Sequence, residues 1–147
     1  MNPLKSINGT ILSGLALAII IMLATTGNEA VALNTAMIWG HVLSGVTWIG
    51  LLYYFNFVQV PALAEAINDE GGPGGAGITK YVAPRALWWF RWGAVFTWLT
   101  GAGYLHLIGK LGSAFELGMR TDDSYSTTIG IGAWLGTIML FNVWVLI

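Results

Sequence analysis

The chain has 147 residues, of which 56% are hydrophobic and 9% are charged, and its formal net charge is −1. Soluble globular domains carry about 25% charged residues. This composition, with a mean hydropathy of +0.70, therefore argues against a soluble domain and predicts an integral membrane protein. The lack of a basic patch argues against nucleic acid as a partner, and the lack of cysteine excludes disulfides and a c-type haem attachment within these residues.

Four apolar segments are long enough to cross a bilayer core, which requires about 20 helical residues. We expect membrane helices at residues 7–26, 34–60, 86–108 and 127–147. The first resembles a signal peptide, but its apolar run is long and no clear cleavage motif precedes the turn after it. The glycine-rich stretch 71–77 predicts a surface loop. The sequence therefore predicts an all-α integral membrane protein, one domain with four transmembrane helices packed as a bundle.

Lysine and arginine are distributed unevenly between the two sides of this predicted bundle. Lys5, Lys80 and Arg85 fall on one side, and Lys110 and Arg120 fall on the other. The positive-inside rule then predicts a cytoplasmic N-terminus and a cytoplasmic loop between the second and third helices.

Both histidines, His41 and His106, lie within predicted membrane helices. Consecutive helices run antiparallel, so the second helix begins on the side where the third ends. His41 lies roughly 10 Å from the start of its helix and His106 roughly 6 Å from Lys110, which puts the two imidazoles at similar depth. Two neutral imidazoles on facing helices are suited to be the axial ligands of a b-type haem. A metal site fits less well, because no carboxylate lies at that level.

Small residues flank both histidines, and they either leave a slot for a flat cofactor or let helices pack closely. They are Gly40, Ser44, Gly45, Gly101 and Gly103. The same small-residue spacing occurs at Gly132 and Gly136, where no histidine is near in sequence. The alternative role for each histidine is a hydrogen bond between helices or a contact with lipid headgroups; a proton relay is a further alternative.

Arg91 is the other residue that is costly within a membrane helix. The run RALWWFRW places Arg85, Trp88, Trp89 and Trp92 on one helical stripe, and Arg91 points elsewhere. One interpretation is an aromatic belt whose arginines reach toward the interface. The other is that Arg91 binds cofactor or substrate through a carboxylate, such as a haem propionate. Glu65, expected at the same membrane face, is a candidate ion-pair partner.

Longer stretches of the chain carry a family resemblance. The run GHVLSGVTWIGLLYYFNFVQVPAL (residues 40–63) resembles the signature of the urate oxidase N-terminal membrane domain family, and residues 82–101 and 140–147 resemble later segments of it. The best-known members are bacterial membrane-bound urate hydroxylases that end in a c-type cytochrome domain. The resemblance covers the chain from about Trp39 onward and matches the first half of that family's membrane region. It implies an oxidoreductase component in the bacterial inner membrane with a c-type cytochrome as electron partner, and it assigns no catalytic residue.

Three hypotheses about function remain open. The first is a membrane-embedded redox protein that binds haem b through His41 and His106, with Arg91 shaping the site, and transfers electrons. The second is a cofactor-free accessory or structural subunit of a larger membrane complex. The third is a fragment or relative of the urate hydroxylase itself, with Arg91 and stacked tryptophans as the receptor for urate, a planar anion. In each case we expect the bilayer as surroundings and a homo-oligomer or larger assembly. Walker, Rossmann, Ser-His-Asp and zincin patterns are absent from the sequence, which argues against nucleotide-driven and hydrolytic functions.

Overall fold

The computed structural model describes residues 5–25, 29–119 and 124–145, and every regular element in these ranges is helical. The chain divides into two units, residues 1–36 and 37–147, and each is considered by itself. The first unit holds α1 (Ile7–Thr25) and the start of α2 (Glu29–Tyr54). α1 is apolar on all sides and has no buried residue, which is typical of a helix surrounded by lipid.

The second apolar segment forms a longer helix than the sequence predicts. α2 continues through the π-helix η2 (Phe55–Gln59) into α3 (Val60–Asn68), well past the expected end at residue 60. Pro61 lacks the N–H that would continue an α-helical ladder. The π turn accommodates this proline, because the Val60 N–H bonds to the carbonyl of Phe55, five residues back. The result is a continuous apolar helix of 37 residues, Ala32–Asn68.

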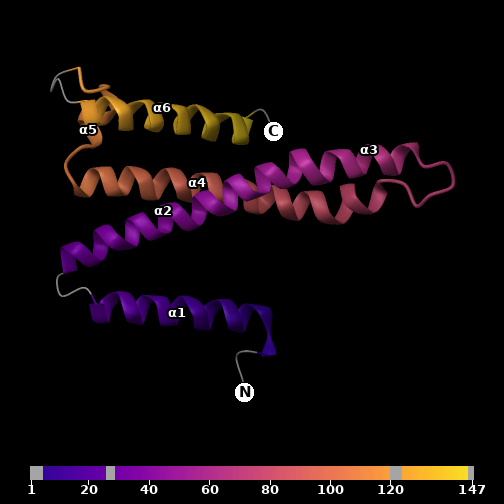
Figure 1. The fold of residues 1–147 in the computed structure, drawn as a ribbon, viewed down its shortest axis with the longest axis horizontal. Helices are drawn as coiled ribbons and strands as arrows, with labels where there is room; N and C mark the ends of the chain where they lie inside the picture. Colours follow the sequence, from indigo (N-terminus) through magenta and orange to yellow (C-terminus); the bar gives the residue numbers. More distant parts are fainter. Residues whose placement is uncertain (1–4, 26–28, 120–123, 146–147) are drawn as a thin grey trace. The chain divides into compact units, whose positions relative to one another are not determined.

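A second π-helix begins the third apolar segment, which starts earlier than the expected residue 86. The π-helix η3 (Ile78–Val82) leads into α4 (Ala83–Leu107), and the Ala83 N–H bonds to the carbonyl of Ile78 just before Pro84. α3 and η3 lie side by side as an antiparallel hairpin (Figure 1). Its connection includes the glycine-rich stretch expected at 71–77, with positive φ at Gly71 and Gly74.

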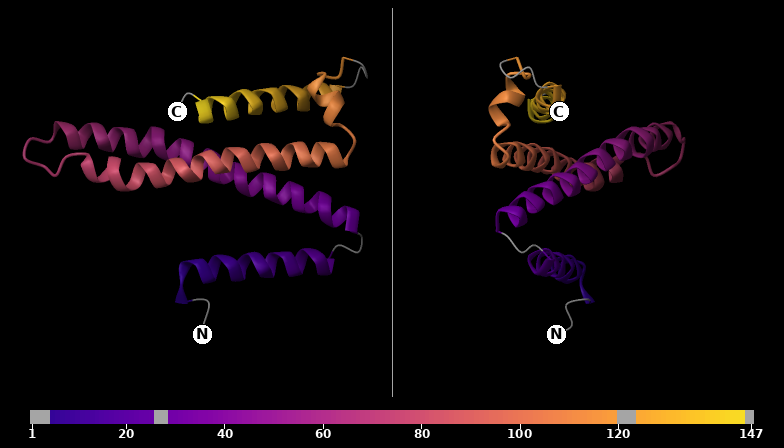
Figure 2. Two further views of the ribbon diagram at one scale, coloured as in Figure 1. Left: turned by 180° about the vertical axis from the view of Figure 1, so that it is seen from behind. Right: turned by 60° about the vertical axis from the view of Figure 1, so that its left-hand side comes forward.

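α4 ends in a glycine cap that turns the chain toward the last helix. Gly109 has a φ of 70°, and the Lys110 N–H reaches back to the carbonyl of Leu105 at 2.8 Å, as in a Schellman motif. A short helix, α5 (Leu111–Phe115), follows, and the sequence analysis did not predict it. α6 (Ser124–Val145) then runs back along α4, as the left view of Figure 2 shows.

A small apolar core joins α2, α4 and α6. It consists of Trp48, Phe90, Ala94 and Val143. The backbone of α2 comes close to α4 at Gly93, where an added Cβ would lie 3.3 Å from the backbone nitrogen of Trp48. Most other large apolar side chains are exposed, as expected for helices in an apolar solvent.

Within the described residues, three helices are long and apolar enough to cross a membrane: Ile7–Thr25, Ala32–Asn68 and Ser124–Val145. α4, the third of the four predicted spans, is not among them. It carries Arg85 and Arg91 and is rich in tryptophan, glycine and threonine in place of aliphatic residues, which lowers its hydropathy. The described part of the chain is therefore all-helical with three candidate membrane-spanning helices.

Candidate functional site

A pocket of about 450 Å³ lies among α2, α4, α5 and α6, all within the unit of residues 37–147. Its lining is overwhelmingly apolar, and its polar members include His41, Thr97 and Tyr104. A volume of this size and a lining with few polar groups are typical of sites for small organic ligands and cofactors.

The imidazole of His41 is held in one orientation by α4. Its Nδ1 lies 2.8 Å from the carbonyl oxygen of Thr97. A carbonyl only accepts hydrogen bonds, so Nδ1 carries the proton and donates. In the neutral imidazole the other ring nitrogen, Nε2, then keeps its lone pair, and it has no hydrogen-bond partner in the described part of the chain. Among the side chains that line the pocket, His41 is thus the one poised to donate a nitrogen lone pair to a ligand.

Gly101 is the residue that lets the His41 ring approach α4. A Cβ built on Gly101 would lie 3.0 Å from both Cε1 and Nδ1 of the imidazole. Any larger residue would displace the ring from Thr97. The sequence analysis identified Gly101 as a small residue near His106, whereas in the structure its contact is with His41.

Gly132 and Gly136 form an open wall of the same pocket on α6. No atom lies within 4 Å of a Cβ built on either glycine, and both residues line the pocket that contains His41. Their spacing was visible in the sequence, but their relation to a histidine was not, because Gly132 lies 91 positions after His41 in the chain. Together with Gly101, Ala102 and Ala133, these small residues leave a narrow space inside the pocket, into which the His41 imidazole faces.

Two indole hydrogen bonds fix the wall formed by α6. The Trp98 Nε1–H donates to Thr137 Oγ1 at 2.8 Å and joins α4 to α6. The Trp134 Nε1–H donates to the carbonyl of Phe115 at 3.0 Å and joins α6 to α5. The two bonds hold α6 in register beside the pocket.

His106 lies outside this pocket. It is in the last turn of α4 and is exposed. It follows Gly101 by five residues, which corresponds to about 140° around the helix and about 7.5 Å along it. His106 is therefore about 7.5 Å along α4 from the level of the His41 ring and lies on a different side of this helix.

Arg91 also lies outside the pocket lining, and it does not pair with Glu65. Its guanidinium carbon is 5.9 Å from the centroid of the Trp144 ring, while its Nε is buried without a hydrogen-bond partner in the described residues. Glu65 is ten residues beyond Phe55, whose ring contacts Phe90. At 1.5 Å per residue, the carboxylate is therefore about 15 Å too far along the hairpin.

The described residues contain no group of three or more His, Asp or Glu side chains that could hold a metal ion by themselves. An iron carried by a porphyrin needs only one or two protein ligands, and His41 meets the requirement for one of them. Comparison of the chain with protein-family models, with curated proteins and with solved structures found no match.

Proposed function

We propose that this chain is a membrane-embedded redox protein that binds a b-type haem through His41 and transfers electrons. The observation that carries the proposal is the hydrogen bond from His41 Nδ1 to the Thr97 carbonyl. A histidine that ligates a metal usually donates its other ring N–H to a carbonyl or carboxylate, which fixes its tautomer and its orientation. Bound haem would supply a one-electron iron couple.

In this proposal the residues of the pocket have separate tasks. His41 holds the iron through Nε2, and the small residues Gly101, Gly132 and Gly136 leave room for a flat macrocycle. The apolar lining excludes water, which tunes the potential of a bound redox centre. A second protein ligand would come from a residue of another chain, since His106 lies outside this pocket, or from His106 if the last turn of α4 rotated on haem binding. The wider setting we propose is a four-helix membrane bundle in the bacterial inner membrane with a cytoplasmic N-terminus.

The test is a dithionite-reduced minus oxidised absorbance spectrum of the protein expressed with added haem precursor and purified in mild detergent. We expect sharp b-type bands that disappear in His41→Ala. His106→Ala is the matched control: bands that persist assign the iron to His41 without His106, and bands that shift or vanish assign His106 as the second ligand. A flat spectrum from well-folded protein, or bands unchanged in His41→Ala, would overturn the proposal.

A cofactor-free subunit of a larger membrane complex is the second candidate. It is favoured by the large apolar area that the helices leave exposed, including Val46, Phe57 and Ile138, since such surface is available to partner helices as well as to lipid. Under this alternative, His41→Ala leaves assembly and activity of the complex intact.

The resemblance to the urate hydroxylase membrane domain adds an expected partner, a c-type cytochrome. Co-purification of a haem-stained cytochrome with the tagged chain would test that partner.

A further inference from the structure

Arg91 lies at the corner where α4 meets the end of α6. Its guanidinium carbon is 5.9 Å from the centroid of the Trp144 ring, and the Trp92 ring meets Trp144 edge to face at 5.9 Å. Trp144 belongs to the candidate span Ser124–Val145, so the cation lies against a membrane span.

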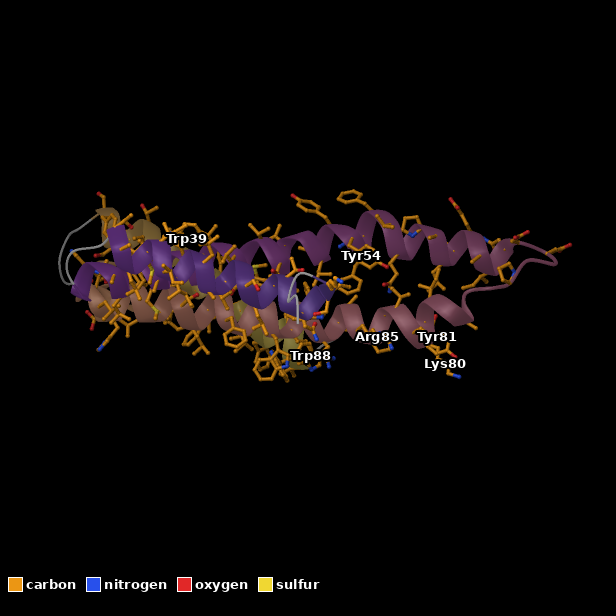
Figure 3. The ribbon with its side chains drawn as sticks, turned by 90° about the horizontal axis from the view of Figure 1, so that it is seen from below. Trp39, Tyr54, Lys80, Tyr81, Arg85 and Trp88 are labelled. Atoms are coloured by element: carbon orange, nitrogen blue, oxygen red, sulfur yellow. The ribbon has the colours of Figure 1, made fainter. Side chains whose placement is uncertain are left out.

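Several tryptophans gather at the same level. Trp88 contacts both Trp89 and Trp92, with ring centroids 5.1 and 6.2 Å apart. Indoles concentrate at the boundary between hydrocarbon and headgroups. The Trp88 side chain lies on the same edge of the hairpin as Arg85 and Lys80, the edge that faces away from α3 (Figure 3). Arg91 thus lies at the depth where lipid phosphates begin.

The charge of Arg91 has no counterion within the described residues. Glu65 is about 15 Å away along the hairpin, and the Nε of Arg91 is buried without a hydrogen-bond acceptor. Leaving a buried charged donor unsatisfied is costly. A contact with the Trp144 ring stabilises a cation but accepts no N–H. The site therefore calls for an anion that brings its own acceptor oxygens.

Arg85, on the same helix, has a hydrogen-bond acceptor for its guanidinium and can be compared with Arg91. Its Nη1 donates to the carbonyl of Tyr81, and the residue is exposed. An arginine that only reached toward water would resemble Arg85. Arg91 differs because its Nε is shielded from solvent, and Arg85 is consequently the natural control.

We propose that Arg91 binds a phosphate group, that of an anionic lipid seated at the corner of α4 and α6 beside Trp144. The planar guanidinium donates two parallel N–H bonds to two phosphate oxygens, a geometry that lysine does not reproduce. The lipid's glycerol and upper acyl chains then lie against the Trp92 and Trp144 rings. This site is separate from the His41 pocket and does not depend on haem.

The experiment is native mass spectrometry of the full chain, delipidated in detergent and titrated with phosphatidylglycerol, phosphatidylcholine or inorganic phosphate. Wild type is compared with Arg91→Gln, Arg91→Lys and the control Arg85→Gln. We expect a single phosphatidylglycerol adduct whose dissociation constant rises at least about tenfold in Arg91→Gln, less in Arg91→Lys, and less than about twofold in Arg85→Gln.

The outcomes separate the source of the anion from the existence of the site. If inorganic phosphate binds with the same dependence on Arg91 and competes with the lipid, the site takes free phosphate as well. Equal affinity for phosphatidylcholine, or equal losses in Arg91→Gln and Arg85→Gln, would overturn the proposal. If Arg91→Gln does not fold, the lipid preference of wild type and the loss in Arg91→Lys decide the question by themselves.

Discussion

The Nδ1 atom of His41 lies 2.8 Å from the carbonyl oxygen of Thr97, across the interface between α2 and α4. This bond fixes the tautomer of the imidazole and leaves Nε2 free to accept a proton or bind iron. It exists only because Gly101, one turn after Thr97, has no side chain to occupy the space that the ring takes. The chemistry at His41 is therefore set by the backbone of α4.

Gly101→Ala should displace the imidazole. The new Cβ would lie 3.0 Å from the ring, closer than ordinary van der Waals contact. Overpacking costs about 1–3 kcal/mol, while the better helix propensity of alanine returns up to about 1 kcal/mol. We expect a net loss of about 1 kcal/mol in unfolding free energy, measured by denaturant titration in detergent, together with weaker haem binding.

Gly50→Ala is the control for this change. Gly50 lies within the neighbouring helix α2, and no atom lies within 4 Å of a Cβ built on it. This variant should be neutral or more stable by up to about 1 kcal/mol, with unchanged haem content. Equal behaviour of the two alanine variants would contradict the close contact between Gly101 and His41.

Gly132→Leu should fill the pocket without unfolding the protein. The space beside Gly132 is empty to at least 4 Å, and leucine is a better helix former than glycine by up to about 1 kcal/mol. We expect unchanged or higher stability and, if the proposed haem occupies this pocket, its loss from the purified protein, measured as the ratio of Soret to protein absorbance. Retention of haem in a folded Gly132→Leu variant would show that the cofactor lies elsewhere.

The sequence predicts the helices well, because each apolar run is long and is bounded by glycine, proline or charge. It misplaces the end of the second helix at Pro61, since a proline ordinarily ends a helix. The π turn at Phe55–Gln59, which accommodates the proline, depends on hydrogen bonds that spacing does not reveal. α5 was missed for a similar reason, because five residues are too few to produce a periodic signal.

The candidate site was only partly predictable. A histidine in an apolar helix is a visible signal, so His41 was found from the sequence. Its partner is a backbone carbonyl, Thr97 O, which any residue type could supply. The count of residues along each helix predicts that His106 lies at a depth similar to that of His41, but it does not predict which side of α4 His106 faces. Gly132 joins the pocket only through the packing of α6, which no local pattern specifies.

The hydrogen bond between Trp98 Nε1 and Thr137 Oγ1 should couple α4 to α6 energetically. The bond is 2.8 Å long and partly buried, and bonds of this kind contribute about 1 kcal/mol. Thr137 also donates to the carbonyl of Ala133, so Thr137→Val alone removes two interactions. A double-mutant cycle with Trp98→Phe isolates the pair, and we expect a coupling of about 0.5–1.5 kcal/mol by denaturant titration. Strict additivity of the two changes would mean that the bond contributes nothing to stability.

Gly109→Ala should destabilise the end of α4. Gly109 has a φ of 70°, a left-handed conformation in which a Cβ costs about 1–2 kcal/mol. The cap bonds from Gly109 and Lys110 to the carbonyls of His106 and Leu105 depend on that conformation. Gly112→Ala in α5 is the matched control, because Gly112 is helical and no atom lies within 4 Å of a Cβ built there. We expect Gly109→Ala to lower the unfolding free energy by about 1 kcal/mol and Gly112→Ala to leave it unchanged or raise it. Equal effects of the two changes would show that α4 does not need its glycine cap.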